Sequence, residues 1–342
     1  MYRPADHVFI VAEAGMNHDG SLGIACRMVD VAADCGVDAV KFQTHFAAAE
    51  TLPDAPAPAY FSAEPRYEYF QRTAFSRAQW DALKAHCAAC KTQFLSSPFS
   101  QEAVELLETI GVPLYKIPSG EVTNLPLIEA VAATRKPVLL SSGMSTWAEL
   151  DRAVNAVLKR HARLVVLQCT SEYPCPAERV GLNMIGEMRD RYEVAVGLSD
   201  HTLTNYAAFA AVTMGAAVIE KHFTLSRNLY GSDAKHSVEP VELCDLVRGI
   251  RAVETMVSKP VDKDDPEPFR AMKRIFQKSI VSLVEIPQGA RIERSMVGIK
   301  KPGTGLPAWR IEEILGRRAL RRVPADSLLH PDDIDWDTAL NA

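Results

Sequence analysis

Two histidines in the second half of the chain have the placement expected of a metal site. His201 follows a short apolar run at 194–199, and His222 lies near the end of the next run, 217–223. If these runs are neighbouring parallel strands, their tips lie about 4.8 Å apart, so the two imidazoles can share one cation. A single histidine there would more often be a core or rim residue, but the pair favours a metal. Two nitrogens with water and oxygen ligands suit manganese, magnesium or iron better than a closed zinc site. The nearby carboxylates are those of Glu13 and Asp200.

Three lysines lie inside apolar runs, Lys41, Lys116 and Lys221. A buried charge is costly unless it is paired or binds a ligand. Lysines beside several hydroxyl groups are typical of a site for a small anion that carries both carboxylate and phosphate groups. Gly120 and the turns near it let backbone amides approach the same anion. The hydroxyl groups expected there belong to Ser96, Ser97, Ser119, Ser141, Ser142, Ser171 and Ser199.

Glu121 is the candidate acid/base residue because it follows Lys116 in the segment KIPSGE, beside the predicted anion site. The alternative interpretation is a salt-bridge partner of Lys116 or Lys41. Burial would raise the pKa of Glu121, whereas the charged surroundings of a barrel mouth with an adjacent phosphate are expected to hold it low. The sequence leaves the net direction open.

These residues lie at or beyond the ends of short runs that alternate with amphipathic, helix-like stretches. Eight such repeats over roughly 250 residues predict a (β/α)₈ barrel, in which active-site residues lie at the C-terminal ends of the strands. A doubly wound open sheet is the alternative, but no Gly-x-Gly-x-x-Gly follows the first strand. The strands are expected at 8–14, 39–44, 92–97, 113–117, 137–142, 164–170, 194–199 and 217–223. The helices are expected at 22–35, 78–90, 101–110, 147–158, 205–214 and 241–256.

Two segments depart from this rhythm. Residues 45–75 form a proline- and aromatic-rich insertion, which predicts either a rim over the barrel mouth or structural packing. A charged, proline-containing linker at 259–275 separates a barrel domain, 1–258, from a small β-rich domain at 276–336 and a tail at 337–342. A domain of that size buries little core, so we expect it to dock against something larger.

Composition excludes several classes of protein. The net charge of −5 argues against a general nucleic-acid binder, and no apolar run approaches the roughly 20 residues that span a membrane. The seven cysteines are scattered, and Cys87 and Cys90 form a lone C-x-x-C without a second pair. That pattern favours reduced thiols and a cytoplasmic protein over a zinc or redox motif.

The strand-end segments, taken in order, resemble those of the bacterial sialic acid (N-acetylneuraminate) synthase family. They read AEAGMNHDG, VKFQTH, KIPSGEVTNLPLI, LSSGMST, CTSEYP, GLSDHT and IEKHFTL. The C-terminal segment resembles the antifreeze-protein-like (SAF) domain of the same family, so the resemblance covers essentially the whole chain. It implies a phosphoenolpyruvate-condensing barrel that works as a homodimer, with the small domain swapped onto the partner subunit.

The resemblance also implies roles for individual residues. His201 and His222 match the metal ligands, with Mn²⁺ expected and Mg²⁺ or Co²⁺ as alternatives, and Glu13 and Glu121 match the acidic residues near the reacting carbons. Tyr173 and Asp233 match positions that contact the sugar. The positions that match the pocket for phosphoenolpyruvate or phosphate are Lys41, Ser97, Lys116, Ser119, Ser141, Ser171 and Ser199.

The departures from the family pattern concern the sugar. Lys301 occupies the place of an arginine that contacts the N-acyl group, and a lysine lacks that planar donor fork. Ile275 stands at an aromatic position. The implied reaction joins phosphoenolpyruvate to N-acetylmannosamine or a related amino sugar. The alternatives are a legionaminic or pseudaminic acid synthase acting on a diacetamido-trideoxyhexose, a synthase of an eight-carbon 3-deoxy acid, and an inactive sugar-binding homologue.

Overall fold

The computed structural model describes residues 7–56 and 64–337. The chain divides into two compact units, Met1–Pro260 and Val261–Ala342, and each is treated by itself. Of the 45–75 insertion, Tyr60 and Phe61 lie outside the described residues, as does the tail beyond Asp337.

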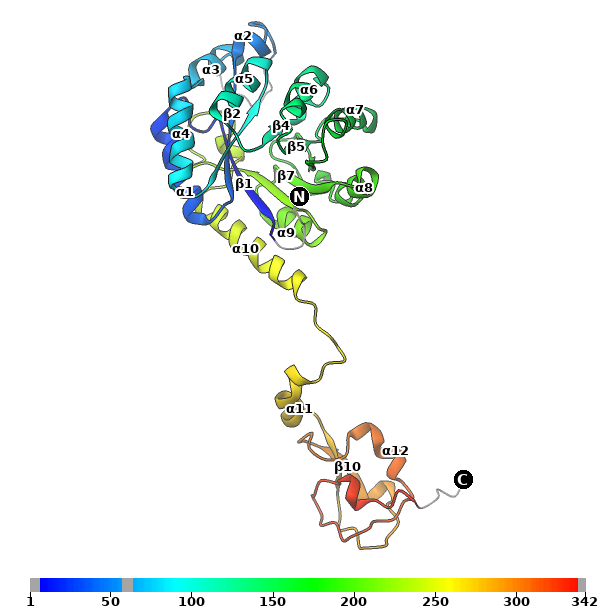
Figure 1. The fold of residues 1–342 in the computed structure, drawn as a ribbon. Helices are drawn as coiled ribbons and strands as arrows, with labels where there is room; N and C mark the ends of the chain where they lie inside the picture. Colours follow the sequence, from blue (N-terminus) through cyan, green and yellow to red (C-terminus); the bar gives the residue numbers. More distant parts are fainter. Residues whose placement is uncertain (1–6, 57–63, 338–342) are drawn as a thin grey trace. The chain divides into compact units, whose positions relative to one another are not determined.

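The first unit is a barrel of eight parallel strands, as the sequence predicts (Figure 1). Hydrogen-bonded ladders join the strands in the order β3-β2-β1-β8-β7-β6-β5-β4. Strands β3 and β4, at the two ends of this order, lie next to one another and close the barrel. The strands are β1 Phe9–Gly15, β2 Ala39–Thr44, β3 Gln93–Pro98, β4 Tyr115–Ile117, β5 Val138–Ser141, β6 Leu164–Cys169, β7 Ala195–Asp200 and β8 Val218–His222.

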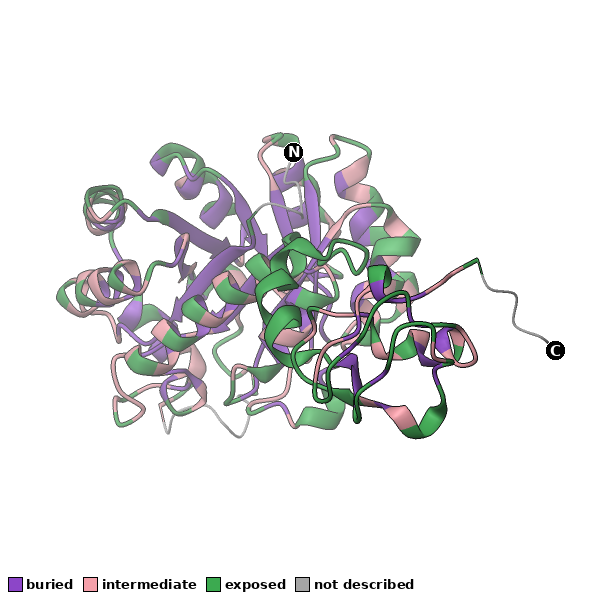
Figure 2. Cartoon of the chain, turned by 90° about the horizontal axis from the view of Figure 1, so that it is seen from below, coloured by how far each residue is buried: buried purple, intermediate pink, exposed green. Residues whose placement is uncertain are grey.

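Helices surround the strands and cover their outer faces, so the strands are buried and the outward sides of the helices are exposed (Figure 2). Two helices that the sequence analysis did not single out, α6 and α8, complete the alternation. The helices of this unit are α1 Leu22–Cys35, α2 Ala47–Glu50, α3 Arg66–Thr73, α4 Arg77–Ala89, α5 Gln101–Ile110, α6 Leu125–Ala133, α7 Trp147–Leu158, α8 Asn183–Tyr192, α9 Tyr206–Thr213 and α10 Pro240–Ser258.

Local sequence explains where several of these helices begin and end. Ser21 caps α1 by accepting a hydrogen bond from the backbone of Ile24, and Gly36 ends that helix with a left-handed φ of 86°. Thr146 and Glu149 form a capping box at the start of α7. These signals place the helix boundaries close to those that the hydrophobic pattern predicts.

The barrel interior is apolar at one end and polar at the other. Successive side chains of a strand point to opposite faces, so inward residues recur at every second position. On β1, Phe9 and Val11 belong to the inner core and Glu13 is the next inward residue. Gly197 on β7 faces a tight interior, since a Cβ atom there would lie 2.4 Å from the carbonyl oxygen of Val218. The inner core is formed by Phe9, Val11, Ala39, Leu95, Leu114, Leu139, Val165, Leu167 and Val218.

A disulfide joins Cys35, at the end of α1, to Cys244 on α10. The expectation of uniformly reduced thiols is therefore wrong for this pair. The two residues are 209 positions apart, so spacing along the sequence gave no sign that the fold brings them together. The other five cysteines are free.

The second unit has its own small core. It contains α11 Arg270–Phe276, β9 Ser279–Ser282, β10 Val297–Lys300 and α12 Ile311–Ile314, and β9 pairs antiparallel with β10. Its buried residues include Ile280, Ile286 and Leu329. Over residues 7–56 and 64–337, no helix combines the length and hydropathy needed to cross a bilayer.

Candidate active site

A cavity of about 500 Å³ opens at the C-terminal ends of the barrel strands. Most barrel residues that the sequence analysis assigned to a site line it. These residues are Glu13, Lys41, Ser97, Lys116, Ser119, Glu121, Ser141, Ser171, Tyr173, Ser199, His201, His222 and Asp233. Lys301 belongs to the second unit, where its ammonium lies 5.0 Å from the centre of the Phe276 ring.

Two lysines and two glutamates form a connected group on the cavity floor. Lys41 Nζ lies 2.7 Å from Glu13 Oε2 and 3.6 Å from Glu220 Oε2, and Lys116 Nζ lies 3.3 Å from Glu220 Oε1. Ser199 donates a hydrogen bond of 3.0 Å to the buried carboxylate of Glu220. The ion pairs of both lysines therefore go to Glu13 and Glu220, and the described structure holds none to Glu121.

The pKa values in this group depend on how many partners each residue has. Burial lowers the pKa of a lysine, but Glu13 and Glu220 outweigh it and raise the pKa of Lys41. Burial prevails for Lys116, whose pKa is lowered and which also feels the charge of Lys41. Burial would raise the pKa of Glu220, yet Lys116, Lys41 and the Ser199 hydroxyl bring it to about 2. Lys116 is thus the ammonium that gains most from an additional anion in the cavity.

Hydroxyl groups that face the cavity supply further anion contacts. Ser141 Oγ is buried and has no hydrogen-bond partner in the described structure, so it is available to a ligand. Ser119 Oγ accepts a hydrogen bond of 3.1 Å from the backbone nitrogen of Gly143. A Cβ atom at Gly143 would lie 2.4 Å from Ser171 Oγ and 2.6 Å from Ser119 Oγ, so glycine is required for the serines to converge.

The histidine pair is suited to hold a cation. The rings of His201 and His222 lie 5.4 Å apart, and the carbonyl of Thr170 contacts His201 Nδ1 at 2.8 Å, which leaves the other ring nitrogen for a ligand. His222 Nδ1 is buried without a hydrogen-bond partner in the part of the chain that the structure describes. Burial and the neighbouring His222 lower the pKa of His201 to about 3, so its imidazole is neutral, as a metal ligand must be. Tyr173 stacks on His201 at 4.2 Å.

Four residues grouped with this site in the sequence analysis do not line the cavity, namely Ser96, Ser142, Asp200 and Lys221. Lys221 falls between the inward residues Glu220 and His222 and faces the other way, where its Nζ lies 2.6 Å from Asp200 Oδ2. The other oxygen of Asp200 accepts a hydrogen bond from the backbone of Thr202. The expectation that all three lysines share one site is therefore wrong for Lys221, and Asp200 is committed to structural partners.

Glu121 lies on the cavity wall at the end of a short 3₁₀ turn, Ser119–Glu121. Burial raises the pKa of its carboxyl, and the hydrogen bond of 2.7 Å from Asn124 opposes that shift. The direction that the sequence left open is therefore upward. A carboxyl group in this position can exchange protons with a bound substrate.

The insertion after β2 contributes residues that the sequence analysis did not assign to the site. His45 contacts Gln43 at 3.0 Å and Glu50 at 2.6 Å, and Gln43 donates to Glu13. Arg66, at the start of α3, lines the cavity and has a buried Nε without a described hydrogen-bond partner. The period of two along β2 places Gln43 inward beside Lys41, but no comparable rule places His45 or Arg66.

Comparisons with known proteins agree with this geometry. Residues 28–262 match the model of the NeuB family, and residues 277–335 match the SAF domain. The chain belongs to the NeuB family. The resemblance to sialic acid synthases is therefore confirmed, as is the barrel with a small SAF domain.

Several relatives of this NeuB-family chain are synthases of legionaminic, pseudaminic or N-acetylneuraminic acid or its 9-phosphate. N,N'-diacetyllegionaminic acid synthase of Campylobacter jejuni is 36% identical, over 94% of this chain and 98% of its own length. The enzyme of the same name from Legionella pneumophila is 34% identical, over 94% and 93%. The crystal structure of N-acetylneuraminic acid synthetase from Leptospira borgpetersenii superposes with a TM-score of 0.69 at 31% identity, covering 78% of this chain and 91% of that one.

Proposed function

We propose that this protein condenses phosphoenolpyruvate with an N-acyl amino sugar and water, giving a nonulosonic acid and phosphate. The observation that carries the proposal is the composition of the cavity: two buried lysines, the unpartnered Ser141 hydroxyl and the His201–His222 pair converge at the strand ends of one barrel. Cations and hydroxyl donors bind the phosphate and carboxylate of phosphoenolpyruvate, and the histidines hold a divalent cation beside them.

The residues of the cavity can serve each bond change. The methylene carbon of phosphoenolpyruvate bonds to the aldehyde carbon of the open-chain sugar, and the aldehyde oxygen takes up a proton. Water then adds to the carbon that bears phosphate, and cleavage of the carbon–oxygen bond releases phosphate. Glu121 exchanges protons with the new hydroxyl and the attacking water, while Lys41 and Lys116 hold the anion in place. A divalent cation at His201 and His222, Mn²⁺ in this proposal, supplies Lewis acidity to the aldehyde oxygen when it is bound.

For the acceptor, the relatives favour a diacetamido-trideoxyhexose over N-acetylmannosamine. Two of the relatives described above are N,N'-diacetyllegionaminic acid synthases. Lys301 in place of the family arginine fits a changed acceptor, because it offers a point charge instead of a planar fork. The test is a panel of N-acetylmannosamine, its 6-phosphate and the diacetamido sugar, each with phosphoenolpyruvate and Mn²⁺. Phosphate release with none of them, from well-folded protein, would favour an inactive sugar-binding homologue.

We also propose that residues 276–336 close the active site of a partner subunit in a cytoplasmic homodimer. The proposal rests on the resemblance and on the KPGTG turn, in which Ser279 fixes the backbone by donating to the carbonyl of Pro302 and accepting from the nitrogen of Gly305. Lys301→Ala should then weaken use of the sugar about 10–150-fold, the loss expected for one charge-assisted contact, and leave phosphoenolpyruvate binding unchanged. Lys301→Arg, which keeps the charge, should retain activity.

A mixed dimer tests the swap. A subunit truncated near Pro266 keeps an intact barrel, and a full-length subunit with Glu121→Gln keeps an intact small domain. If the small domain serves the partner, the mixed dimer regains activity. If mixed dimers form and remain inactive, each small domain serves its own barrel and the swap is wrong.

A further inference from the structure

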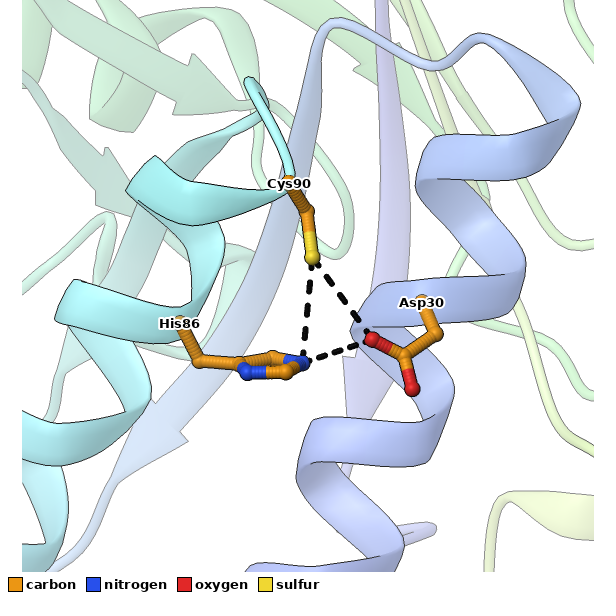
Figure 3. Close-up of side chains that lie close together, drawn as sticks. All are labelled: Asp30, His86 and Cys90. Atoms are coloured by element: carbon orange, nitrogen blue, oxygen red, sulfur yellow. Dashed lines mark hydrogen bonds and ion pairs between the residues drawn. The ribbon is translucent and has the colours of Figure 1, made fainter.

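Outside the catalytic cavity, one set of side chains brings three different metal-ligand atoms together. Asp30 lies on α1, His86 lies on α4 and Cys90 follows the end of α4 (Figure 3). His86 Nε2 lies 2.7 Å from Asp30 Oδ1, and Cys90 Sγ lies 3.6 Å from that oxygen and 3.8 Å from that nitrogen. None of the three lines the catalytic cavity.

The geometry differs from that of a nucleophilic triad. A triad needs the acid on one ring nitrogen of the histidine and the thiol on the other, so that a proton can pass across the ring. Here the carboxylate oxygen and the thiol both face Nε2, as Figure 3 shows. The three atoms surround a common point, which is the arrangement of ligands around a cation.

We infer that Asp30, His86 and Cys90 form a binding site for Zn²⁺ on the outer layer of the barrel. Thiolate, imidazole and carboxylate are the ligands that zinc takes in proteins, at about 2.0–2.3 Å. Tetrahedral bonds of those lengths separate the donor atoms by roughly 3.3–3.6 Å. The sulfur distances of 3.6 and 3.8 Å already fit, and the contact of 2.7 Å must open when the metal enters.

The helix positions provide further support. His86 and Cys90 are four residues apart, which places them on one side of α4 and its end, and Asp30 faces them from the helix packed alongside. Arg27 contacts the other oxygen of Asp30 at 3.6 Å, which leaves Oδ1 for the site. Side-chain exposures of 33% for His86 and 35% for Asp30 leave an entry path and room for water as the fourth ligand.

Cys26 is a candidate for that fourth position. It lies four residues before Asp30 on α1, a spacing that places both residues on the same side of the helix, and the Asp30 charge contributes to a raised pKa of its thiol, after burial. Burial and the hydrogen bond to Asp30 also raise the pKa of Cys90. A bound cation would reverse both shifts, because it favours the thiolate form. In such a site the metal would clamp α1 to α4.

Titration of metal-free, full-length protein with Co²⁺ tests the inference, since cobalt bound by a thiolate gives a charge-transfer absorption that carboxylate and imidazole ligands lack. We expect that absorption in the wild-type protein, together with displacement of the cobalt by Zn²⁺. It should weaken or vanish in Cys90→Ser and should vanish in the double variant Cys26→Ser/Cys90→Ser. In His86→Gln, which keeps the thiol, zinc affinity should fall by more than the ~10–100-fold that loss of an outer-shell partner costs.

Two controls separate this site from the rest of the molecule. The absorption should persist in His201→Ala, because that residue belongs to the catalytic cavity. A weaker absorption in Cys26→Ser as well as in Cys90→Ser, with complete loss only in the double variant, would identify Cys26 as the fourth ligand. No thiolate–cobalt absorption in folded wild-type protein, or an absorption of unchanged intensity in folded Cys90→Ser, would overturn the zinc site.

Discussion

The floor of the catalytic cavity and its rim are built in different ways. The floor residues Lys41, Lys116 and Glu220 lie on barrel strands and hold one another through ion pairs of 3.3–3.6 Å. The rim residues His45 and Arg66 come from the insertion, and Arg66 has a buried donor without a described partner. A floor fixed by the barrel suits the part of the reaction that relatives share, whereas a rim on loops can change with the sugar.

The largest expected effect comes from the histidine pair, which also lies on the barrel strands or directly after them. His201→Ala or His222→Ala should reduce activity below detection and abolish binding of the catalytic metal, because one imidazole cannot hold the cation alone. Far-ultraviolet circular dichroism should remain that of the wild type. Full activity of either variant after chelator treatment would show that the reaction does not need a metal at this pair.

Glu121 tests whether a wall residue performs proton transfer. Glu121→Gln should lower kcat by about 10²–10⁴-fold, the usual contribution of general acid–base catalysis. Because burial raises the pKa of Glu121, its carboxylate is lost as the pH falls through a value above 4.5, and activity should fall there. That acid limb should be missing from the residual activity of Glu121→Gln. Glu129→Gln, an exposed carboxylate on α6, should match the wild type.

Lys116 tests the assignment of the floor to phosphoenolpyruvate. A charge-assisted contact contributes about 1.5–3 kcal/mol, so Lys116→Ala should raise the KM for phosphoenolpyruvate about 10–150-fold and change that for the sugar far less. Steady-state kinetics with each substrate varied in turn measure the difference. Equal effects on both substrates would make Lys116 a structural partner of Glu220.

Arg66 gives the smallest expected effect and bears on the rim. Arg66→Ala should raise the KM for the sugar several-fold, within the range of one net hydrogen bond, and leave that for phosphoenolpyruvate unchanged. Arg72→Ala on the same helix is the matched control, since Arg72 pairs with Asp19 and Glu64 and does not line the cavity. If Arg66→Ala changes only the KM for phosphoenolpyruvate, Arg66 contacts that substrate and not the sugar.

The same contrast explains what could be predicted from the sequence. Alternation along a strand has a fixed period of two, so the inward position of Lys41, Ser199 or Glu220 follows once the strand is identified. The same rule, applied strictly, turns Lys221 outward, and its grouping with the other lysines ignored that period. Loops follow no such period, so the contribution of Arg66 to the cavity needed the structure.

Contacts between segments far apart in the sequence could not be predicted from it either. The Cys35–Cys244 disulfide joins α1, which belongs to the first repeat of the barrel, to α10, which belongs to the last. The convergence of Asp30 with His86 depends on how α1 and α4 pack, although the C-x-x-C that contains Cys90 was visible. In that motif Cys87 is buried in the core and does not join the three ligand atoms.

In the proposed condensation, phosphate leaves by cleavage of the bond between carbon and the bridging oxygen. Phosphoenolpyruvate labelled with ¹⁸O in the bridging oxygen, incubated with the diacetamido sugar, Mn²⁺ and enzyme, tests it directly by mass spectrometry of both products. The account predicts one nine-carbon acid per phosphate, with the label in the phosphate. Label retained in the sugar acid, or phosphate released without a new carbon–carbon bond, would contradict it.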